Sequence, residues 1–390
     1  MRITLLVAVC GATLALPACQ SAYDDSGSAG PAGAAYTGAG SPSNGGGSAP
    51  AAGVITAGEW RDLSNWGFWQ TLAQKPEWQV HQGRWQLFTT KRYTLTLTDA
   101  AGQPLAGAQV RIGSAPATTG VTAAVTDRQG QAELFPTMFS AAPVASNPLP
   151  ITVEYRGQTF TPAPVQPNEV AAARTVAVTA SAAAPVDVMF VVDATGSMGD
   201  EISYLKTELR DVITRAAAQL PAADLRLASV FYRDQGDAYV TRTQPFTTDA
   251  SQLLAFVQNQ QADGGGDFPE AVEEALTEAL RQQWSAEARC RLLFLVLDAP
   301  PHDAAAARMQ QLIRQAAQQG VRLIPVTASG IDQGTEYLMR AGAIGTGGTY
   351  VFITNHSGIG NAHLEASVGD YQVEYLNNLL VRLITQYSQP

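Results

Sequence analysis

The fold is decided by the stretch VDVMFVVDATGSM, residues 186–198. Residues 186–192 are apolar apart from one aspartate, which is typical of a strand buried on both faces of a parallel sheet. The strand runs directly into a loop that begins at Asp193 and is rich in carboxylate and hydroxyl oxygens. A stripe of apolar residues at helical spacing follows, formed by Ile202, Leu205, Leu209, Val212, Ile213 and Ala216. The sequence therefore predicts a strand, a polar loop and a helix in succession.

The same alternation continues to the end of the chain. Further strands are predicted at 225–232, 239–246, 292–297, 321–327 and 350–353, the second of these as an antiparallel edge strand. Further helices are predicted at 268–280, 303–319 and 371–384, with Gly320 ending the middle one. Strands that alternate with helices indicate a doubly wound, mainly parallel α/β sheet over residues 184–390. Ligands of such sheets bind outside the carboxyl ends of the strands.

Three polar loops fall at those strand ends. They are DATGSM at 193–198, DGGGDFPE at 263–270 and DAPPH at 298–302. The pattern Asp-x-Thr-x-Ser is similar to the metal-ion-dependent adhesion site of von Willebrand factor A domains, which carry Asp-x-Ser-x-Ser. The separation of the first and third loops, 298 − 193 = 105 residues, also suits that family. The resemblance covers about residues 184–390.

The resemblance implies a bound divalent metal ion, with Mg²⁺ expected first and Mn²⁺ or Ca²⁺ as alternatives. The implied ligands, direct or through water, are Asp193, Thr195, Ser197, Asp267 and Asp298. Their oxygen atoms suit hard cations. The family leaves one coordination position for a carboxylate of a protein partner. We therefore expect a metal-dependent protein-binding lipoprotein, in adhesion or envelope assembly, and no enzyme. Asp267 stands where the family commonly has threonine, and its added negative charge favours the metal over an acidic partner residue.

Alternatives remain at several of these positions. Asp267 also precedes Phe-Pro-Glu270, so it is equally a candidate helix N-cap with a capping-box partner. His302 is interpreted as a residue beyond the metal's direct ligands or a surface residue. Asp234 and Asp237 either enlarge the acidic rim of the site or, as we favour, are turn residues.

Enzyme signatures are absent from the sequence. Thr195 occupies the place of the first glycine in a Gly-x-Ser-x-Gly nucleophile elbow, and neither a Gly-x-x-x-x-Gly-Lys loop nor a His-Glu-x-x-His motif occurs. Two alternatives to the binding protein stay open. One is a Mg²⁺-dependent hydrolase of the cell envelope, and the other is a structural spacer whose metal only stabilises the fold.

The N-terminus predicts export and lipid anchoring. Arg2 precedes an apolar run at 3–16 that is too short to span a bilayer and fits a signal peptide, residues 1–18. The run ends in Leu16-Pro-Ala-Cys19, which resembles a bacterial lipobox, so Cys19 is the expected lipidation site. Gln20, and not aspartate, follows Cys19. The resemblance to enteric lipoproteins then implies the outer membrane, with the protein in the periplasm or at the surface. Residues 19–53 are rich in Gly, Ser, Ala and Pro and are predicted to be a disordered tether.

Two segments lie between the tether and the α/β region. Residues 54–88 contain five of the six tryptophans, which either expose a binding surface or, as we favour, pack against a neighbouring domain. Residues 89–183 show period-two strands and turns that predict a small β-sandwich, and DAAGQPLAGAQV with TDRQGQAEL resembles carboxypeptidase-regulatory, transthyretin-like sandwiches. The net charge is −10, with 24 Lys and Arg against 34 Asp and Glu, so a nucleic-acid partner is not expected.

Overall fold

The computed structural model describes residues 51–113, 120–141, 147–166, 168–180, 185–220, 225–358 and 363–388. All of these residues belong to one compact unit, Ser48–Pro390. The predicted signal segment, Cys19 and nearly all of the predicted tether lie outside the described residues.

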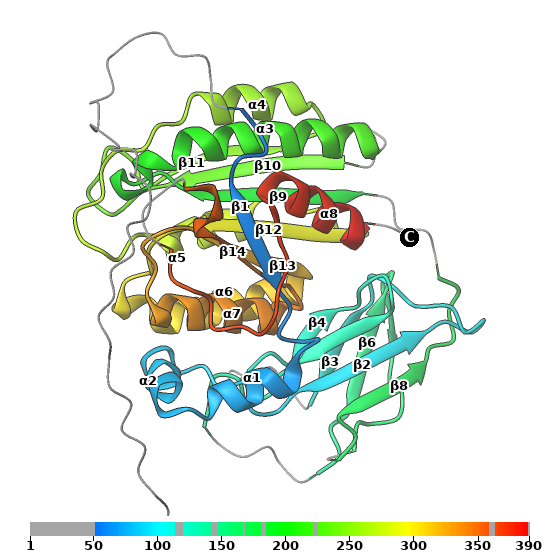
Figure 1. Cartoon of the computed structure of the whole chain (residues 1–390). Coiled ribbons are helices and arrows are strands. Elements are labelled where there is room, and N and C mark those ends of the chain that lie inside the picture. The colour runs from blue at the N-terminus through cyan, green and yellow to red at the C-terminus, as the bar shows by residue number, and fades with distance from the viewer. Residues whose placement is uncertain are drawn as a thin grey trace, which may run out of the picture. The chain divides into compact units, whose positions relative to one another are not determined.

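An eight-stranded sheet forms the centre of this unit (Figure 1). Five neighbouring strands run parallel, and the outer strands β11, β1 and β15 pair antiparallel. This arrangement confirms the predicted mainly parallel α/β class. In spatial order the strands are β11 (Thr241–Thr247), β10 (Leu225–Tyr232), β9 (Val186–Asp193), β12 (Cys290–Leu297), β13 (Val321–Thr327), β14 (Tyr350–Ile353), β1 (Thr56–Trp60) and β15 (Val373–Tyr375).

Helices cover both faces of the sheet, and the central strand β9 shows why. Its Val188, Phe190 and Val192 enter the core on one face, while Met189 and Val191 enter the core on the other. Because strand residues alternate between faces, a continuous apolar run is needed to bury both. The first face is covered by α3 (Ile202–Gln219), α4 (Ala250–Gln258) and α8 (Leu376–Ser388), and the second by α5 (Val272–Arg281), α6 (Ala306–Gln319) and α7 (Gln333–Thr346).

Several predicted elements differ from the structure. Residues 268–271 are not helical, because α5 begins at Val272. The segment predicted as a helix from 371 contains the short strand β15 at its start, and α8 begins only at Leu376. Helix α7 was not predicted, because every residue from 334 to 345 is buried and such a helix shows no polar face.

Strand β1 belongs to the α/β sheet although it lies far away in the sequence. It pairs with β14 and β15, and a side chain at Gly58 would meet the Phe352 ring at 2.6 Å. The buried carboxylate of Glu208 on α3 fixes its start by accepting from the backbone nitrogens of Gly53 and Val54, each at 2.9 Å, and of Ile55 at 3.2 Å. The sheet therefore includes residues 56–60 as well as residues after 184.

Two smaller sheets follow β1 in the sequence. One has the order β5 (Gln131–Leu134), β2 (Tyr93–Thr98) and β8 (Ala171–Thr175), and the other has the order β4 (Ala123–Val125), β3 (Gln109–Ile112), β6 (Ile151–Tyr155) and β7 (Gln158–Phe160). Alternate residues of β2 are buried, and they share one core with residues of the second sheet. We call residues 89–180 the two-sheet unit. Helix α6 packs against its strand β4.

The tryptophan-rich segment forms α1 (Trp66–Ala73) and α2 (Pro76–Trp85), which pack on α7. The rings of Trp69 and Trp78 contact Tyr337, at centroid distances of 5.6 and 5.8 Å. Arg340 is fully buried over both indoles and forms ion pairs with Asp62 and Glu336. Four of the five tryptophans are buried, so these rings serve packing rather than an exposed surface.

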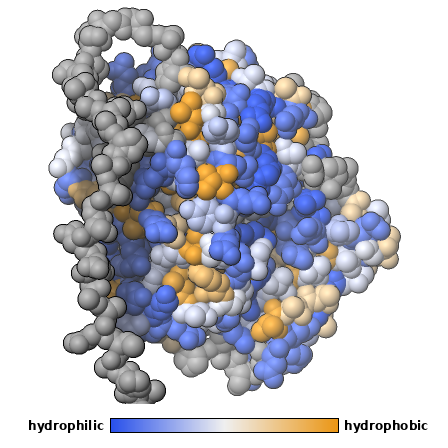
Figure 2. Space-filling model, in the orientation of Figure 1, coloured by the Kyte–Doolittle hydropathy of each residue, from blue (hydrophilic) through white to orange (hydrophobic). Residues whose placement is uncertain are grey.

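The face of the molecule in Figure 2 is mostly hydrophilic, with small separate hydrophobic patches. Among the described residues, no helix combines the length and the apolar character needed to cross a membrane.

Candidate metal centre

The carboxyl ends of β9 and β12 bring the first and third predicted loops together. The two strands are parallel neighbours paired through Val192 and Val296, so Asp193 and Asp298 follow the same edge of the sheet. Both side chains are buried, at 0% and 5% exposure. Two carboxylates are thus held side by side where a doubly wound sheet places its ligand.

The first loop orders its oxygen atoms around Asp193. The Oδ1 atom of Asp193 accepts from the Thr195 backbone nitrogen at 2.9 Å and from Thr195 Oγ1 at 2.7 Å. The Thr195 hydroxyl lies 3.2 Å from Ser197 Oγ, and Ser197 is exposed on the short helix η1 (Gly196–Asp200). Neither hydroxyl caps that helix. The loop therefore presents a row of oxygens from the buried sheet edge to solvent.

Three buried carboxyl groups at this edge repel one another. We call Asp193, Asp298 and Glu270 the carboxylate cluster. Burial, first, and neighbouring carboxylates raise the pKa of Asp193 to about 6, of Asp298 to about 7 and of Glu270 to about 9. One oxygen of each, Asp193 Oδ2, Asp298 Oδ1 and Glu270 Oε2, is buried and forms no hydrogen bond of normal geometry among the described residues. The hydroxyls of Tyr232 and Ser197 lie near Asp193 and Asp298 and lower their pKa values, but they do not offset burial. Buried oxygens without partners are costly, so the cluster requires a proton or a cation.

The second loop depends on two glycines in the left-handed region. Gly264 and Gly265 have φ angles of +78° and +73°. A side chain at Gly264 would lie 2.4 Å from the carboxylate of Asp237, and one at Gly265 would lie 2.9 Å from Glu270 Oε1. The Gly264 carbonyl in turn accepts from the Gly196 nitrogen at 3.0 Å. These contacts fix the second loop against the first and place Asp267 at their rim.

Asp267 is not a helix cap. Helix α5 begins four residues later than the capping prediction requires, with Ala271 as its N-cap residue. The capping-box interpretation of Asp267 and Glu270 is therefore wrong. The side chain of Asp267 is exposed and lies beside Asp234 and His302, and one ligand atom from each of the three lies within 4.8 Å of the other two.

An open hollow of about 390 Å³ lies between the first, second and third loops. Its lining includes Ser197, Asp267, Phe268, Glu270 and Asp298, with glycines of the second loop. Phe268 is 47% exposed at its rim. Four of the five predicted ligands thus come from the first and third loops at the sheet edge, and Asp267 lies between them and the pair formed by Asp234 and His302.

Sequence analysis missed three members of the site. His302 and Asp234 were interpreted as peripheral, yet His302 Nε2 lies 3.7 Å from Asp234 Oδ1, and both residues have buried polar atoms without hydrogen-bond partners among the described residues. Glu270 was assigned to a capping box. The signal for the first two was their position, since each follows the end of a parallel strand by a few residues.

Residues 187–356 match the family model of the von Willebrand factor A domain, a range that contains all five predicted ligands. A putative ariadne-like RING finger protein of Acanthamoeba polyphaga mimivirus is 31% identical over 125 residues, which are 32% of this chain and 12% of that protein. The chain therefore spans a small part of that relative's length.

Two solved bacterial structures are also similar in part. An aerotolerance-related membrane protein of Bacteroides fragilis aligns with 52% of this chain and 98% of its own, at 16% identity and a TM-score of 0.34. The conserved hypothetical protein BatB of Bacteroides thetaiotaomicron aligns with 53% and 100%, at 15% identity and a TM-score of 0.36.

Proposed function

We propose that this chain, whose residues 187–356 match the von Willebrand factor A domain, is an envelope lipoprotein that binds a protein partner through a divalent metal ion. Domains of this family commonly bind divalent metals, and the described residues include an Asp, Asp and His group with ligand spacing. The proposed role is binding without catalysis.

The observation that carries the proposal is the set of unpartnered oxygens in the carboxylate cluster. Asp193 Oδ2 and Asp298 Oδ1 are buried and form no hydrogen bond of normal geometry among the described residues, and the first loop brings the Thr195 and Ser197 hydroxyls to the same site. A divalent cation would stabilise the ionised carboxylates against burial, which is the main cause of these raised pKa values, and against repulsion by neighbouring carboxylates. The residues present therefore fit a metal ion, which Asp193, Thr195, Ser197 and Asp298 would hold.

The donor atoms favour Mg²⁺ at this position, because all are oxygens from carboxylates and hydroxyls. Asp267 borders the same hollow and would add negative charge at its rim. Asp267 also stands beside Asp234 and His302, where an imidazole nitrogen suits Mn²⁺ or a softer ion better than Mg²⁺. A preference for Mg²⁺ thus indicates binding by Asp193, Asp298 and the two hydroxyls, and a preference for Mn²⁺ indicates binding by Asp234, Asp267 and His302.

The rim of the hollow supplies a contact surface for a partner. Phe268 is an exposed aromatic side chain beside the proposed ion, and aromatic residues are enriched at the centres of protein interfaces. The carboxylates around the ion keep the site negative even with one divalent cation bound. We therefore expect the partner to contact the rim through neutral and apolar groups more than through an acidic residue.

The proposed anchor is the lipid on Cys19. In cells, Cys19→Ser should abolish incorporation of a radiolabelled fatty acid and release the protein from the membrane fraction. Labelled and membrane-bound Cys19→Ser protein would contradict lipidation at this residue, while leaving the metal site untouched.

The partner hypothesis is tested with residues 20–390, which retain every described residue. This protein is immobilised and incubated with an envelope extract of the source organism, with Mg²⁺ or with a chelator. Asp193→Asn should lose the metal-dependent capture. Asp370→Asn, an exposed carboxylate far from the site in sequence, removes the same charge and should retain it. Identical capture by all three proteins would contradict the proposal. Metal stabilisation without any capture would favour the structural spacer.

A further inference from the structure

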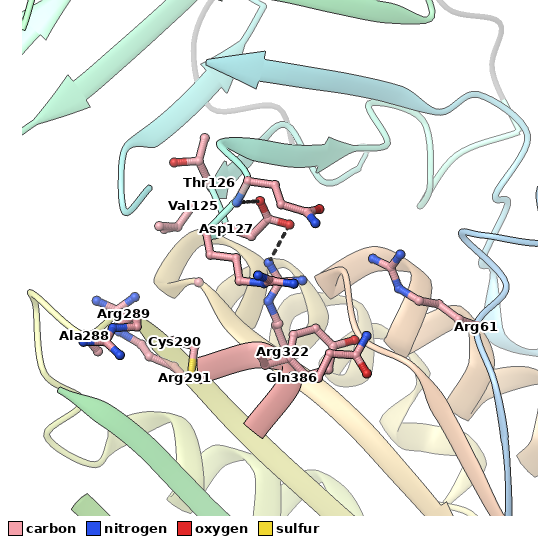
Figure 3. A pocket seen from close by; sticks show the side chains of 14 residues that line it. Arg61, Val125, Thr126, Asp127, Ala288, Arg289, Cys290, Arg291, Arg322 and Gln386 are labelled. Carbon is pink, nitrogen blue, oxygen red and sulfur yellow. Dashed lines mark hydrogen bonds and ion pairs between the residues drawn. The ribbon is translucent and has the colours of Figure 1, made fainter. Parts of the chain in front are cut away.

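A second pocket, shown from close by in Figure 3, lies at the end of the central sheet opposite the carboxyl strand ends of the candidate metal centre. It has a volume of about 120 Å³ and lies at the amino ends of β12 and β13, against the turn after β4 of the two-sheet unit. Because parallel strands share one direction, their amino ends cannot border the metal site. The pocket is therefore a separate feature of the molecule.

The lining is strongly basic for a chain of net charge −10. Its charged side chains are one carboxylate, that of Asp127, and five guanidinium groups, those of Arg61, Arg128, Arg289, Arg291 and Arg322. Figure 3 shows Arg322 reaching toward Asp127, with Arg289 and Arg291 on one side and Arg61 on the other. Five cations and one anion give the side chains that line the pocket a net charge of +4.

Most of the hydrogen bonds of these arginines do not compensate their charge. Arg291 donates to the carbonyls of Ser285 and Ala286, at 2.7 to 3.0 Å, and Arg289 donates to the Ser388 carbonyl at 2.9 Å. Carbonyl oxygens accept hydrogen bonds but carry no net charge. Arg291 is 8% exposed, and the nearby buried carboxylate of Asp187 offsets part of its charge. The charges of Arg61 and Arg128 have no such counter-ion among the described residues.

Two of the five arginines have donors available for a ligand. The Nε atom of Arg61 is buried without a hydrogen-bond partner, although its Nη1 donates to Ser64 Oγ at 3.2 Å. Arg128 forms no hydrogen bond or ion pair with the described residues, although it is half-buried in the pocket wall. The fifth, Arg322, lies 3.5 Å from Asp127 and also donates to the Gly347 carbonyl.

We propose that this pocket binds a phosphate group, either as the free ion or as the end of a small phosphate ester. Guanidinium groups match phosphate because their parallel N–H donors form paired hydrogen bonds with its oxygens. A dianion also compensates more of the local charge than a carboxylate does. The volume admits one tetrahedral anion and excludes a folded segment of protein.

The bound anion would join two parts of the fold. Arg128 belongs to the two-sheet unit, Arg61 follows β1, and the other three arginines lie on or just before β12 and β13. A phosphate in contact with Arg128, with Arg61 and with the arginines at β12 and β13 would strengthen the packing of the two-sheet unit on the α/β sheet. This site is independent of the metal and of the partner proposed above.

The test is calorimetric titration of residues 20–390 with inorganic phosphate and, separately, with glycerol 3-phosphate, at constant ionic strength. Arg61→Gln and Arg128→Gln should each weaken binding about tenfold or more, since each removes charge-assisted hydrogen bonds. Arg210→Gln on the exposed side of α3 removes the same charge and should bind as the unaltered protein does. Tighter binding of the free ion or of the ester identifies which form the pocket takes.

The melting temperatures of all variants are measured in chloride as a control for folding. Well-folded Arg61→Gln and Arg128→Gln proteins with unchanged phosphate affinity would overturn the proposal. The absence of any phosphate binding by the unaltered protein would overturn it as well. Metal binding should be unaffected in either case.

Discussion

Removing the buried charge of Asp193 distinguishes between two roles of this side chain, that of a metal ligand and that of a structural hydrogen-bond acceptor. Asp193→Asn keeps the size of the side chain and its Oδ1 acceptor for Thr195, but it removes the negative charge next to Asp298. If the cluster exists to hold a cation, the chelated protein carries an unfavourable charge that the variant lacks. The variant should then be the more stable protein without metal and the less stable one with metal.

The magnitude follows from the pKa of Asp193. Burial and neighbouring carboxylates raise it from 3.8 to about 6, so the ionised form is disfavoured in the folded chain by about 2 pH units. At about 1.4 kcal/mol per unit, ionised Asp193 costs about 3 kcal/mol at pH 8. A metal at 1,000 times its Kd stabilises the folded protein by about 4 kcal/mol, which exceeds that cost and reverses the order of the two proteins.

The assay is thermal unfolding of both proteins at pH 8, first with a chelator and then over a series of Mg²⁺ concentrations. The prediction is a higher melting temperature for Asp193→Asn in the chelator and a rise with Mg²⁺ in the unaltered protein alone. A variant that is several degrees less stable in the chelator would refute the reasoning, because the carboxylate would then be a structural acceptor. An equal response of both proteins to Mg²⁺ would refute it too.

Three further outcomes are expected. Glu208→Ala leaves the backbone donors at the start of β1 without their acceptor, so it should lower the free energy of unfolding by about 3 kcal/mol in urea titrations. A loss below about 0.5 kcal/mol would mean that β1 is held by its neighbouring strands alone. Gly264→Ala should reduce the metal affinity measured by calorimetry, because the added side chain would displace Asp237. Gly266→Ala should leave the affinity unchanged, because a side chain there would have no other atom within 4 Å. Equal affinities of the two variants would show that the loop adjusts. In the chelator, the free energy of unfolding should rise as the pH falls from about 9 to about 5, because the folded carboxylate cluster binds protons that the unfolded chain has released. Saturating Mg²⁺ should reverse this trend. A flat pH profile in the chelator would contradict the raised pKa values.

The strands that could be predicted from the sequence are those whose own residues indicate burial on both faces. The apolar runs of β9, β12 and β13 indicate strands covered on both faces, and the structure places all three at the centre of the sheet. Strand β1 could not be predicted as part of that sheet, because its partners β14 and β15 are about 300 residues away and the two-sheet unit intervenes. Pairing over such separations leaves no local signal in the sequence.

The candidate site was predictable in its strand-end residues and not in its loop contacts. Asp193 and Asp298 follow strands directly, so their meeting is a consequence of parallel pairing. The capping prediction for Asp267 was wrong because Glu270 forms a parallel bridge with Pro301 and donates its backbone N–H to the Pro300 carbonyl, so helix α5 begins only at Val272. The approach of Asp234 and His302 depends on the same loop geometry, which spacing in the sequence does not specify.

The most direct test of a metal held at the sheet edge is the location of the ion itself. Crystals of residues 20–390 are soaked in Mn²⁺, and its anomalous scattering gives the position of the metal. The account predicts a peak within coordination distance of Ser197 and Thr195, between Asp193 and Asp298, and no such peak in Asp193→Asn crystals. The absence of a peak between Asp193 and Asp298, or the same peak there in Asp193→Asn crystals, would contradict it, whether or not Mn²⁺ also binds between Asp234, Asp267 and His302.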